Sequence, residues 1–126
     1  MKNKPFEFTA RMRSVRYALR GIWTMVRTQQ NAWLHALATA VVVTAGIFFN
    51  ITREEWNWVI LAIMAVWTAE ALNTAFEFLA DATNPTFHPL IGKAKDVAAG
   101  AVLIAVIGSV AIGCIIFGPH IIGLVR

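Results

Sequence analysis

The chain has 126 residues, 58% of them hydrophobic and 14% charged, and a formal net charge of +4. Because soluble domains carry about 25% charged residues, this composition excludes an ordinary soluble domain and predicts one membrane domain over residues 1–126. The single cysteine, Cys114, excludes an internal disulfide. Basic residues gather before residue 28, as in a nucleic-acid-binding arm, but the apolar remainder of the chain indicates a membrane surface as the partner and no nucleic acid.

Residues 1–28 have the pattern of an amphipathic helix. Apolar residues recur there at spacings of three and four: Phe8, Met12, Val15, Leu19, Ile22 and Val26. At about 100° per residue they form one narrow stripe, and arginines flank it. The pattern predicts a helix that lies in the membrane interface with its arginines among the lipid phosphates. A soluble core helix is the alternative interpretation.

Three apolar runs predict transmembrane helices over about residues 30–50, 56–81 and 95–117. The first has no charged residue and is long enough to cross a hydrocarbon layer of about 30 Å. The second reaches that length only if the polar residues of its C-terminal half belong to the same helix. Pro85, Pro89 and Gly92 are expected to separate the second helix from the third, and Gly118-Pro119 is expected to end the third.

The distribution of basic residues predicts an N-terminus in the cytoplasm. With three spans, this orientation puts nine basic residues inside: Lys2, Lys4, Arg11, Arg13, Arg16, Arg20, Arg27, Lys93 and Lys95. It leaves only Arg53 and Arg126 outside. An excess of lysine and arginine on the cytoplasmic side is the general rule for membrane proteins.

Four polar residues follow one face of the second predicted span. Glu70, Asn73, Glu77 and Asp81 are spaced 3, 4 and 4, so they fall within roughly 40° of one another on a helix. A charged side chain in the bilayer centre costs about 3 kcal/mol or more, so such groups normally face other helices, water or a cation. A divalent cation with oxygen ligands, such as Mg²⁺, is the expected partner. The alternative is that these groups only join helices by hydrogen bonds.

A second polar cluster stands at the cytoplasmic start of the third span. Lys95 and Asp96 lie there, and a helix N-terminus beside a lysine favours an anion. The alternative is a lysine that extends to the interface beside an aspartate cap. The face of the second span that carries Glu70, Asn73, Glu77 and Asp81 is called the carboxylate face below. Together with this face, the cluster suggests phosphoryl transfer from a nucleotide. No P-loop and no kinase-type glycine loop is present, so a nucleotide site must be built differently.

The segments EALNTAFEFLAD, FHPL and GKAKDVAAGAVLIA, in this order, resemble the prokaryotic diacylglycerol kinase family, which includes diacylglycerol kinases and undecaprenol kinases. The resemblance covers nearly the whole chain. It implies an all-α integral membrane protein with an N-terminal amphipathic surface helix and three transmembrane helices. It also implies a homotrimer in the bacterial cytoplasmic membrane, with active sites shared between neighbouring subunits.

The reaction that the resemblance implies is transfer of the γ-phosphoryl group of MgATP to a membrane lipid alcohol at the cytoplasmic surface. Carried over by motif, Glu70 is the general base on the lipid hydroxyl, and Glu77 is a Mg²⁺ ligand. The implied nucleotide-binding residues are Tyr17, Arg20, Gln29, Glu77, Lys95 and Asp96. The residues implied to shape the substrate site are Asn31, His35, Asn73 and Asp81.

One position departs from the family pattern. The family has a glutamate in a pattern like E-x-N-x-x-x-H before the first span, whereas this chain reads QQNAWLH and has Gln29 at that position. The resemblance implies that this residue shares the metal with Glu77. Glutamine offers a carbonyl oxygen without charge. Either the metal site is weaker, or another group completes it, or the glutamine was introduced by substitution.

The lipid that accepts the phosphoryl group stays open. Asn31, His35 and the AAGAVL run favour the undecaprenol kinase branch over the diacylglycerol kinase branch. A small proton- or ion-coupled transporter that uses the intramembrane carboxylates is the alternative function, but it does not need Lys95 and Asp96. A structural membrane anchor is a third interpretation, and it leaves the carboxylate face without a purpose.

Overall fold

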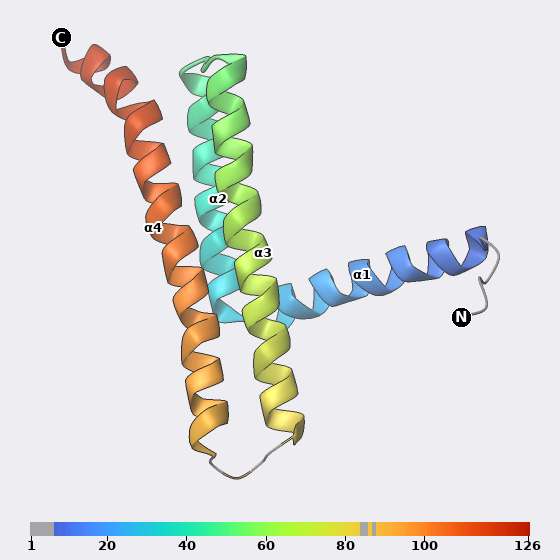
Figure 1. Cartoon of the computed structure of the whole chain (residues 1–126). Coiled ribbons are helices and arrows are strands. Elements are labelled where there is room, and N and C mark those ends of the chain that lie inside the picture. The colour runs from blue at the N-terminus through green and yellow to red at the C-terminus, as the bar shows by residue number, and fades with distance from the viewer. Residues whose placement is uncertain (1–6, 84–85, 87) are drawn as a thin grey trace.

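The computed structural model describes residues 7–83, 86 and 88–126, and these residues form four helices joined by short connections. The helices are α1 (Phe8–Thr28), α2 (Gln30–Phe48), α3 (Arg53–Thr83) and α4 (Pro89–Val125). α2, α3 and α4 run side by side, and α1 projects away from them at a steep angle (Figure 1). The last three helices are long and apolar enough to cross a membrane. The prediction of an all-α chain with three candidate spans is confirmed.

The corner between α1 and α2 is a single residue. Gln29 has an extended backbone (φ −104°, ψ 121°), and its N–H still donates to the carbonyl of Met25 at the end of α1. One extended residue between two helices changes the direction of the chain, so α1 does not continue along the axis of α2. Residues 1–6 of the predicted amphipathic segment lie outside the described residues.

The turn between α2 and α3 is defined by two local motifs. Asn50 has a left-handed backbone (φ 49°), and the N–H groups of Asn50 and Ile51 donate to the carbonyls of Ile47 and Gly46. This pattern is a Schellman motif, in which asparagine tolerates the left-handed position. Thr52 and Glu55 then form a reciprocal capping box at the start of α3, with distances of 2.8 and 3.2 Å.

The buried hydrophobic core lies at this same end of the bundle. It consists of Ile51, Val59, Ile116 and Phe117, from the turn, α3 and α4. Most other large apolar side chains are exposed on the isolated chain, as expected where lipid or another protein surface covers them. This small core therefore holds the helices together at one end of the bundle. Their other apolar faces are left for contact with lipid or with another protein.

α4 begins earlier than the sequence predicts. Pro89 stands in its first turn, and the His88 side chain accepts a hydrogen bond from the Leu90 N–H at 3.2 Å. Proline is favoured at the first helical position because its missing N–H needs no partner there. The predicted break over residues 81–93 is therefore too long, and Gly92 lies inside the helix. Pro85, another residue of the predicted break, lies outside the described residues.

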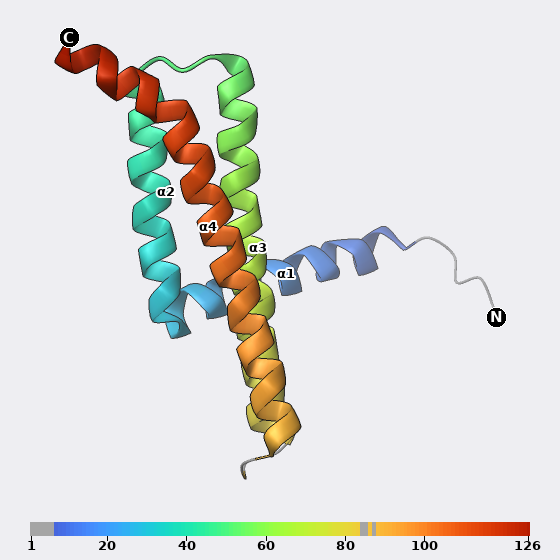
Figure 2. The same ribbon diagram turned by 60° about the vertical axis from the view of Figure 1, so that its left-hand side comes forward.

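α4 also ends later than the sequence predicts. The expected span over 95–117 stopped before Pro119, but the helix continues through this proline, and its C-terminal end turns away from the bundle (Figure 2). Proline removes one helical hydrogen bond and bends a helix without always ending it. The residues beyond the bend are held by His120, whose Nε2 lies 3.4 Å from Glu55 Oε1 and whose ring lies 5.5 Å from that of Phe49.

α3 and α4 form the most extensive helix contact, and both continue past the level of α1 (Figures 1 and 2). α3 begins three residues before the predicted start at residue 56 and ends two residues after residue 81. The C-terminal turns of α3 therefore pass the α1–α2 corner. This arrangement brings the carboxylate face of α3 close to α1 and α2 on one side and to α4 on the other.

Candidate active site

Glu70 is a fully buried carboxylate at the centre of the site, with 0% of its surface exposed. Its Oε2 lies 3.1 Å from Nε2 of His35 on α2. Its backbone carbonyl accepts a hydrogen bond from Thr74 Oγ1 at 2.9 Å. Oε1 of the same carboxylate has no hydrogen-bond partner among the described residues. A buried polar atom without a partner is costly, so an oxygen left in this state indicates a position where a ligand binds.

The next turn of α3 carries a second pair of polar residues. Asn73 is buried, and its Nδ2 donates to Glu77 Oε1 at 3.4 Å. Its own Oδ1 has no partner among the described residues. Glu77 is half-buried. The amide therefore orients the Glu77 carboxylate and keeps one free oxygen beside it, so this turn offers two oxygen ligands.

The carboxylate face ends at the exposed tip of the α3–α4 hairpin. Asp81 Oδ1 lies 3.4 Å from Nζ of Lys95 on α4. The two side chains are 72% and 41% exposed. Glu70 and Asp81 are eleven residues apart, or about 16 Å along a helix at 1.5 Å per residue. The polar face therefore runs from a buried carboxylate to solvent, which suits a reaction between a lipid and a soluble substrate.

A cavity of about 510 Å³ separates α1 from α3. Tyr17 and Arg20 line it from α1, and Thr74 lines it from α3. The Arg20 guanidinium carbon lies 5.9 Å from the centre of the Tyr17 ring. Two residues that the sequence assigns to the nucleotide thus lie beside the turn of α3 that carries Glu70. An arginine and an aromatic hydroxyl in such a cavity are suited to bind phosphate.

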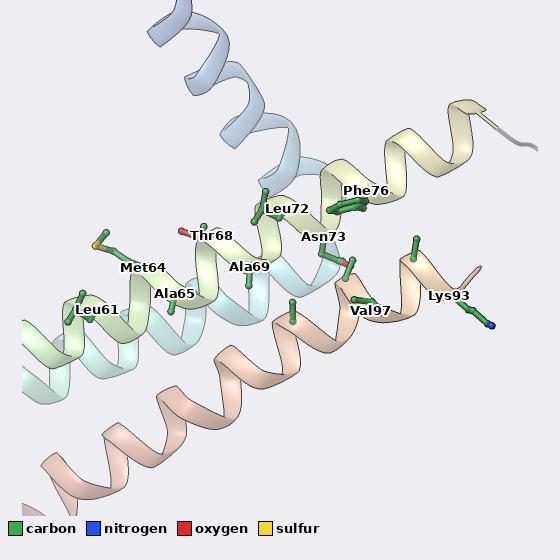
Figure 3. A pocket seen from close by; sticks show the side chains of 13 residues that line it. Leu61, Met64, Ala65, Thr68, Ala69, Leu72, Asn73, Phe76, Lys93 and Val97 are labelled. Atoms are coloured by element: carbon green, nitrogen blue, oxygen red, sulfur yellow. The ribbon is translucent and has the colours of Figure 1, made fainter. Parts of the chain in front are cut away.

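A groove of about 820 Å³ lies between α3 and α4 on another side of the hairpin (Figure 3). Its lining is mainly apolar, with Leu72 and Phe76 from α3 and Val97 from α4. The side chain of Asn73 extends from α3 toward α4 within it (Figure 3). The groove thus places a buried amide next to a large apolar surface.

Three predicted site residues have no polar contact with the rest of the site in a single chain. Asn31 and Asp96 are exposed, and Gln29 is half-buried at the α1–α2 corner. Within the described part of the chain, no hydrogen bond or ion pair joins Gln29 to Glu77, or Asp96 to Tyr17 or any other site residue. A complete site therefore needs either a bound ligand or a further chain to bring these groups together.

The donor set fits a magnesium ion carried by a nucleotide. No group of three or more His, Cys, Asp or Glu side chains able to hold a metal is found within residues 7–83, 86 and 88–126. Mg²⁺ commonly binds through one or two carboxylates together with substrate phosphates and water, so it does not need such a group. The Glu77 carboxylate and the free Oδ1 of Asn73 offer the oxygen ligands that Mg²⁺ prefers.

Sequence reasoning missed two residues that support the site. Trp67 Nε1 donates to Thr39 Oγ1 at 3.0 Å, and Thr39 Oγ1 donates to the His35 carbonyl at 2.7 Å. Thr39 lies one turn after His35, and Trp67 lies one turn before Glu70, so helical spacing puts each beside a predicted site residue. Both looked like ordinary residues of apolar spans, and only their contact across α2 and α3 distinguishes them.

Comparisons with known proteins place the chain among lipid kinases. The model of the prokaryotic diacylglycerol kinase family matches residues 16–117. An undecaprenol kinase of Bacillus subtilis is 39% identical over 105 residues, which cover 83% of this chain and 85% of that protein. A diacylglycerol kinase of Synechocystis is 36% identical over 84% of this chain and 62% of that protein. A diacylglycerol kinase of Escherichia coli is 28% identical over 95% of this chain and 98% of that protein.

These relatives are lipid kinases, and the matched segment contains every residue of the candidate site from Tyr17 to Asp96. A kinase family implies ATP as the co-substrate, and the relationship does not favour the transporter alternative. Three helices able to span a membrane and the buried Glu70 carboxylate agree with that assignment. The chain belongs to the prokaryotic diacylglycerol kinase family.

Proposed function

We propose that this protein transfers the γ-phosphoryl group of ATP to the hydroxyl of a membrane lipid alcohol at the cytoplasmic surface, and releases the lipid phosphate and ADP. The observation that carries the proposal is Glu70, a fully buried carboxylate with one oxygen bound to His35 and the other without a partner. A general base needs a free oxygen within reach of the proton that it accepts. Glu70 Oε1 supplies the free oxygen, since it has no hydrogen-bond partner among the described residues.

Glu70 takes the proton of the lipid hydroxyl as the hydroxyl oxygen bonds to the γ-phosphorus. Glu77, Asn73 and Gln29 would hold Mg²⁺, which would supply positive charge against the phosphates. Lys95 and Arg20 bind the nucleotide phosphates, and Tyr17 and Asp96 complete the nucleotide site. The shape of the site around the lipid and the nucleotide is set by His35, Asn31 and Asp81.

The assembly that we propose is a homotrimer in the bacterial cytoplasmic membrane. Its N-termini lie in the cytoplasm, and each α1 lies in the membrane interface. The α3–α4 groove supports this assembly, because its large apolar lining suits cover by a neighbouring chain. Lys95 and Asp96 have no contact with Tyr17 or Arg20 within one chain. A neighbouring α4 beside α1 and α3 would complete the nucleotide site.

The proposed lipid is a polyprenol, with diacylglycerol as the second substrate to test. Asn31 and His35 match the pattern that favours the undecaprenol kinase branch, and His35 contacts Glu70 directly. A long polyprenol and a diacylglycerol both present a single hydroxyl at the membrane surface, so the reaction is the same for either. The two lipids differ only in what surrounds that hydroxyl.

Activity is tested by reconstituting the full chain in liposomes with γ-labelled ATP, Mg²⁺ and either undecaprenol or diacylglycerol. Wild type and Gln29→Glu are compared over a range of Mg²⁺ concentrations. We expect labelled lipid phosphate from both proteins, and a lower Mg²⁺ concentration for half-maximal activity in Gln29→Glu, because a carboxylate binds Mg²⁺ more strongly than an amide. If neither protein labels either lipid, the chain is not a kinase for these lipids.

The shared site is tested by mixing two variants that are each nearly inactive at an ATP concentration far below the KM of Lys95→Met. Glu70→Gln and Lys95→Met are combined in equal amounts in denaturant and refolded into liposomes. If neighbouring chains contribute the two residues, activity returns to about one quarter of wild type, because each site draws each side from either variant with equal chance. If one chain contributes both residues, the mixture stays inactive. Each variant refolded alone is the control.

A further inference from the structure

His35 is the one polar side chain of α2 that reaches the carboxylate face of α3 within the described residues. Its Nε2 lies 3.1 Å from Glu70 Oε2, and its side chain is 13% exposed. A general base must be ionised before it accepts a proton, and an ionised carboxylate only accepts hydrogen bonds, so in this role of Glu70 the ring donates from Nε2. This contact binds one carboxylate oxygen and leaves Oε1 without a partner.

The imidazole ring packs against Trp67 of α3, and Thr39 links this tryptophan to the His35 backbone. Thr39 Oγ1 donates to the His35 carbonyl, and Trp67 Nε1 donates to Thr39 Oγ1. The Trp67 ring meets the His35 ring edge to face, with 6.1 Å between centroids and 69° between planes. The network joins α2 to α3 at the depth of Glu70, and the Trp67 ring limits how far the imidazole can turn away from Glu70.

We propose that His35 is a positioning residue for Glu70. By donating to Oε2, it holds the carboxylate in the orientation in which Oε1 faces the lipid hydroxyl. This inference rests on the proposed function. As the hydroxyl O–H bond breaks, the oxygen bonds to the γ-phosphorus, the bond from that phosphorus to ADP breaks, and the proton passes to Oε1. Water removes this proton before the next cycle.

The role predicts which property of the enzyme changes when the ring is lost. A carboxylate that is free to turn spends only part of its time with an oxygen toward the hydroxyl. A misplacement of about 1 Å at a reacting group can cost about 100-fold in rate. We therefore expect His35→Ala to lower kcat by about 10- to 100-fold. KM for ATP should change by less than about twofold, because His35 does not line the cavity that holds Tyr17 and Arg20.

The test compares three substitutions in the full chain reconstituted in liposomes. His35→Gln places an amide N–H near the position of Nε2, whereas His35→Asn is too short to reach Oε2. We expect kcat to fall in the order wild type, Gln, then Asn and Ala together. Added imidazole should raise kcat of His35→Ala and leave His35→Asn unchanged, because asparagine fills part of the space.

The matched control is the other histidine–glutamate pair of the chain. His120 Nε2 lies 3.4 Å from Glu55 Oε1, and Glu55 precedes Glu70 by fifteen residues, or about 22 Å along α3. His120→Ala should keep kcat within about twofold of wild type. A loss of kcat in His120→Ala equal to that in His35→Ala would show a general effect of removing a helix contact and would overturn the inference.

The remaining outcomes separate this inference from the proposed function. If wild type phosphorylates lipid and His35→Ala keeps full kcat, His35 does not position the base, and the kinase function stands. If neither wild type nor Gln29→Glu phosphorylates lipid, the proposed function itself fails. If His35→Ala does not fold, the comparison of Gln with Asn decides, and equal kcat in the two overturns the inference.

Discussion

Replacing Glu70 by glutamine removes the proposed base and keeps its shape. The glutamine carbonyl oxygen still accepts a hydrogen bond from His35 Nε2, so the contact at 3.1 Å between α2 and α3 is retained. A positioned general base typically contributes about 10²- to 10⁴-fold to the rate. Each factor of ten is about 1.4 kcal/mol, so the expected loss is about 3–5.5 kcal/mol of transition-state stabilisation.

The burial of Glu70 indicates where that loss is measured. The carboxylate is 0% exposed and Oε1 has no partner in the described part of the chain, so the neutral amide adds no new buried charge. Folding and assembly should therefore be unchanged, whereas kcat for lipid phosphorylation should fall. The assay is initial-rate labelling of lipid phosphate in liposomes, with size-exclusion chromatography of the same protein in detergent.

Two results would refute this reasoning about Glu70. If Glu70→Gln keeps kcat within about threefold of wild type, another group accepts the proton. If kcat falls together with the assembled fraction, the residue is structural. Glu77→Gln is the contrasting variant, because Glu77 is half-buried beside Asn73 and is assigned to the metal. It should raise the Mg²⁺ concentration for half-maximal activity, whereas Glu70→Gln should not.

Three further predictions concern the packing of the turn and the nucleotide site. Gly46→Ala should lower the free energy of unfolding by about 1–3 kcal/mol, because a Cβ there would lie 2.6 Å from the Trp56 ring. The measurement is a denaturant titration in detergent, and an unchanged unfolding midpoint would contradict this prediction. Asn50→Val should cost about 1–2 kcal/mol in the same titration because its φ is 49°, whereas Asn50→Gly should cost nothing; equal midpoints would show that the left-handed position is not needed. Lys95→Met should raise KM for ATP and leave the midpoint within about 1 kcal/mol, because an exposed pair such as Lys95–Asp81 stabilises little; a lower midpoint with normal KM would make Lys95 structural.

The spacing of residues along the chain was sufficient to predict which helix face carries much of the candidate site. The spacing of Glu70, Asn73 and Glu77 put them on one face of a helix, and the structure has them on one continuous α3. Pattern could not tell how deeply each is buried, because burial depends on which helices approach that face. Glu70 and Asn73 are buried and Asp81 is exposed because α1 and α2 reach only part of α3.

The ends of α4 show where local sequence signals do not suffice to predict a helix boundary. Pro89 and Pro119 are both expected to mark boundaries, yet one starts α4 and the other lies inside it. A proline in the first turn needs no donor partner, so Pro89 favours a start. Pro119 only bends the helix, because contacts of His120 with Glu55 and Phe49 hold the turns beyond it. Such contacts come from distant parts of the chain and have no signal in the local sequence.

The sequence alone determined the class of the molecule: a helical membrane protein with three apolar spans, a basic N-terminal helix and a polar face on the second span, because composition and periodicity act within each segment. Only the tertiary structure decided which faces meet. His35 and Glu70 are thirty-five residues apart, and Tyr17 reaches the cavity beside Thr74 from another helix. Periodicity defines the faces of a helix, but the crossing of helices selects the pairs that touch, and that selection gives the Glu70 carboxylate one bound oxygen and one free oxygen.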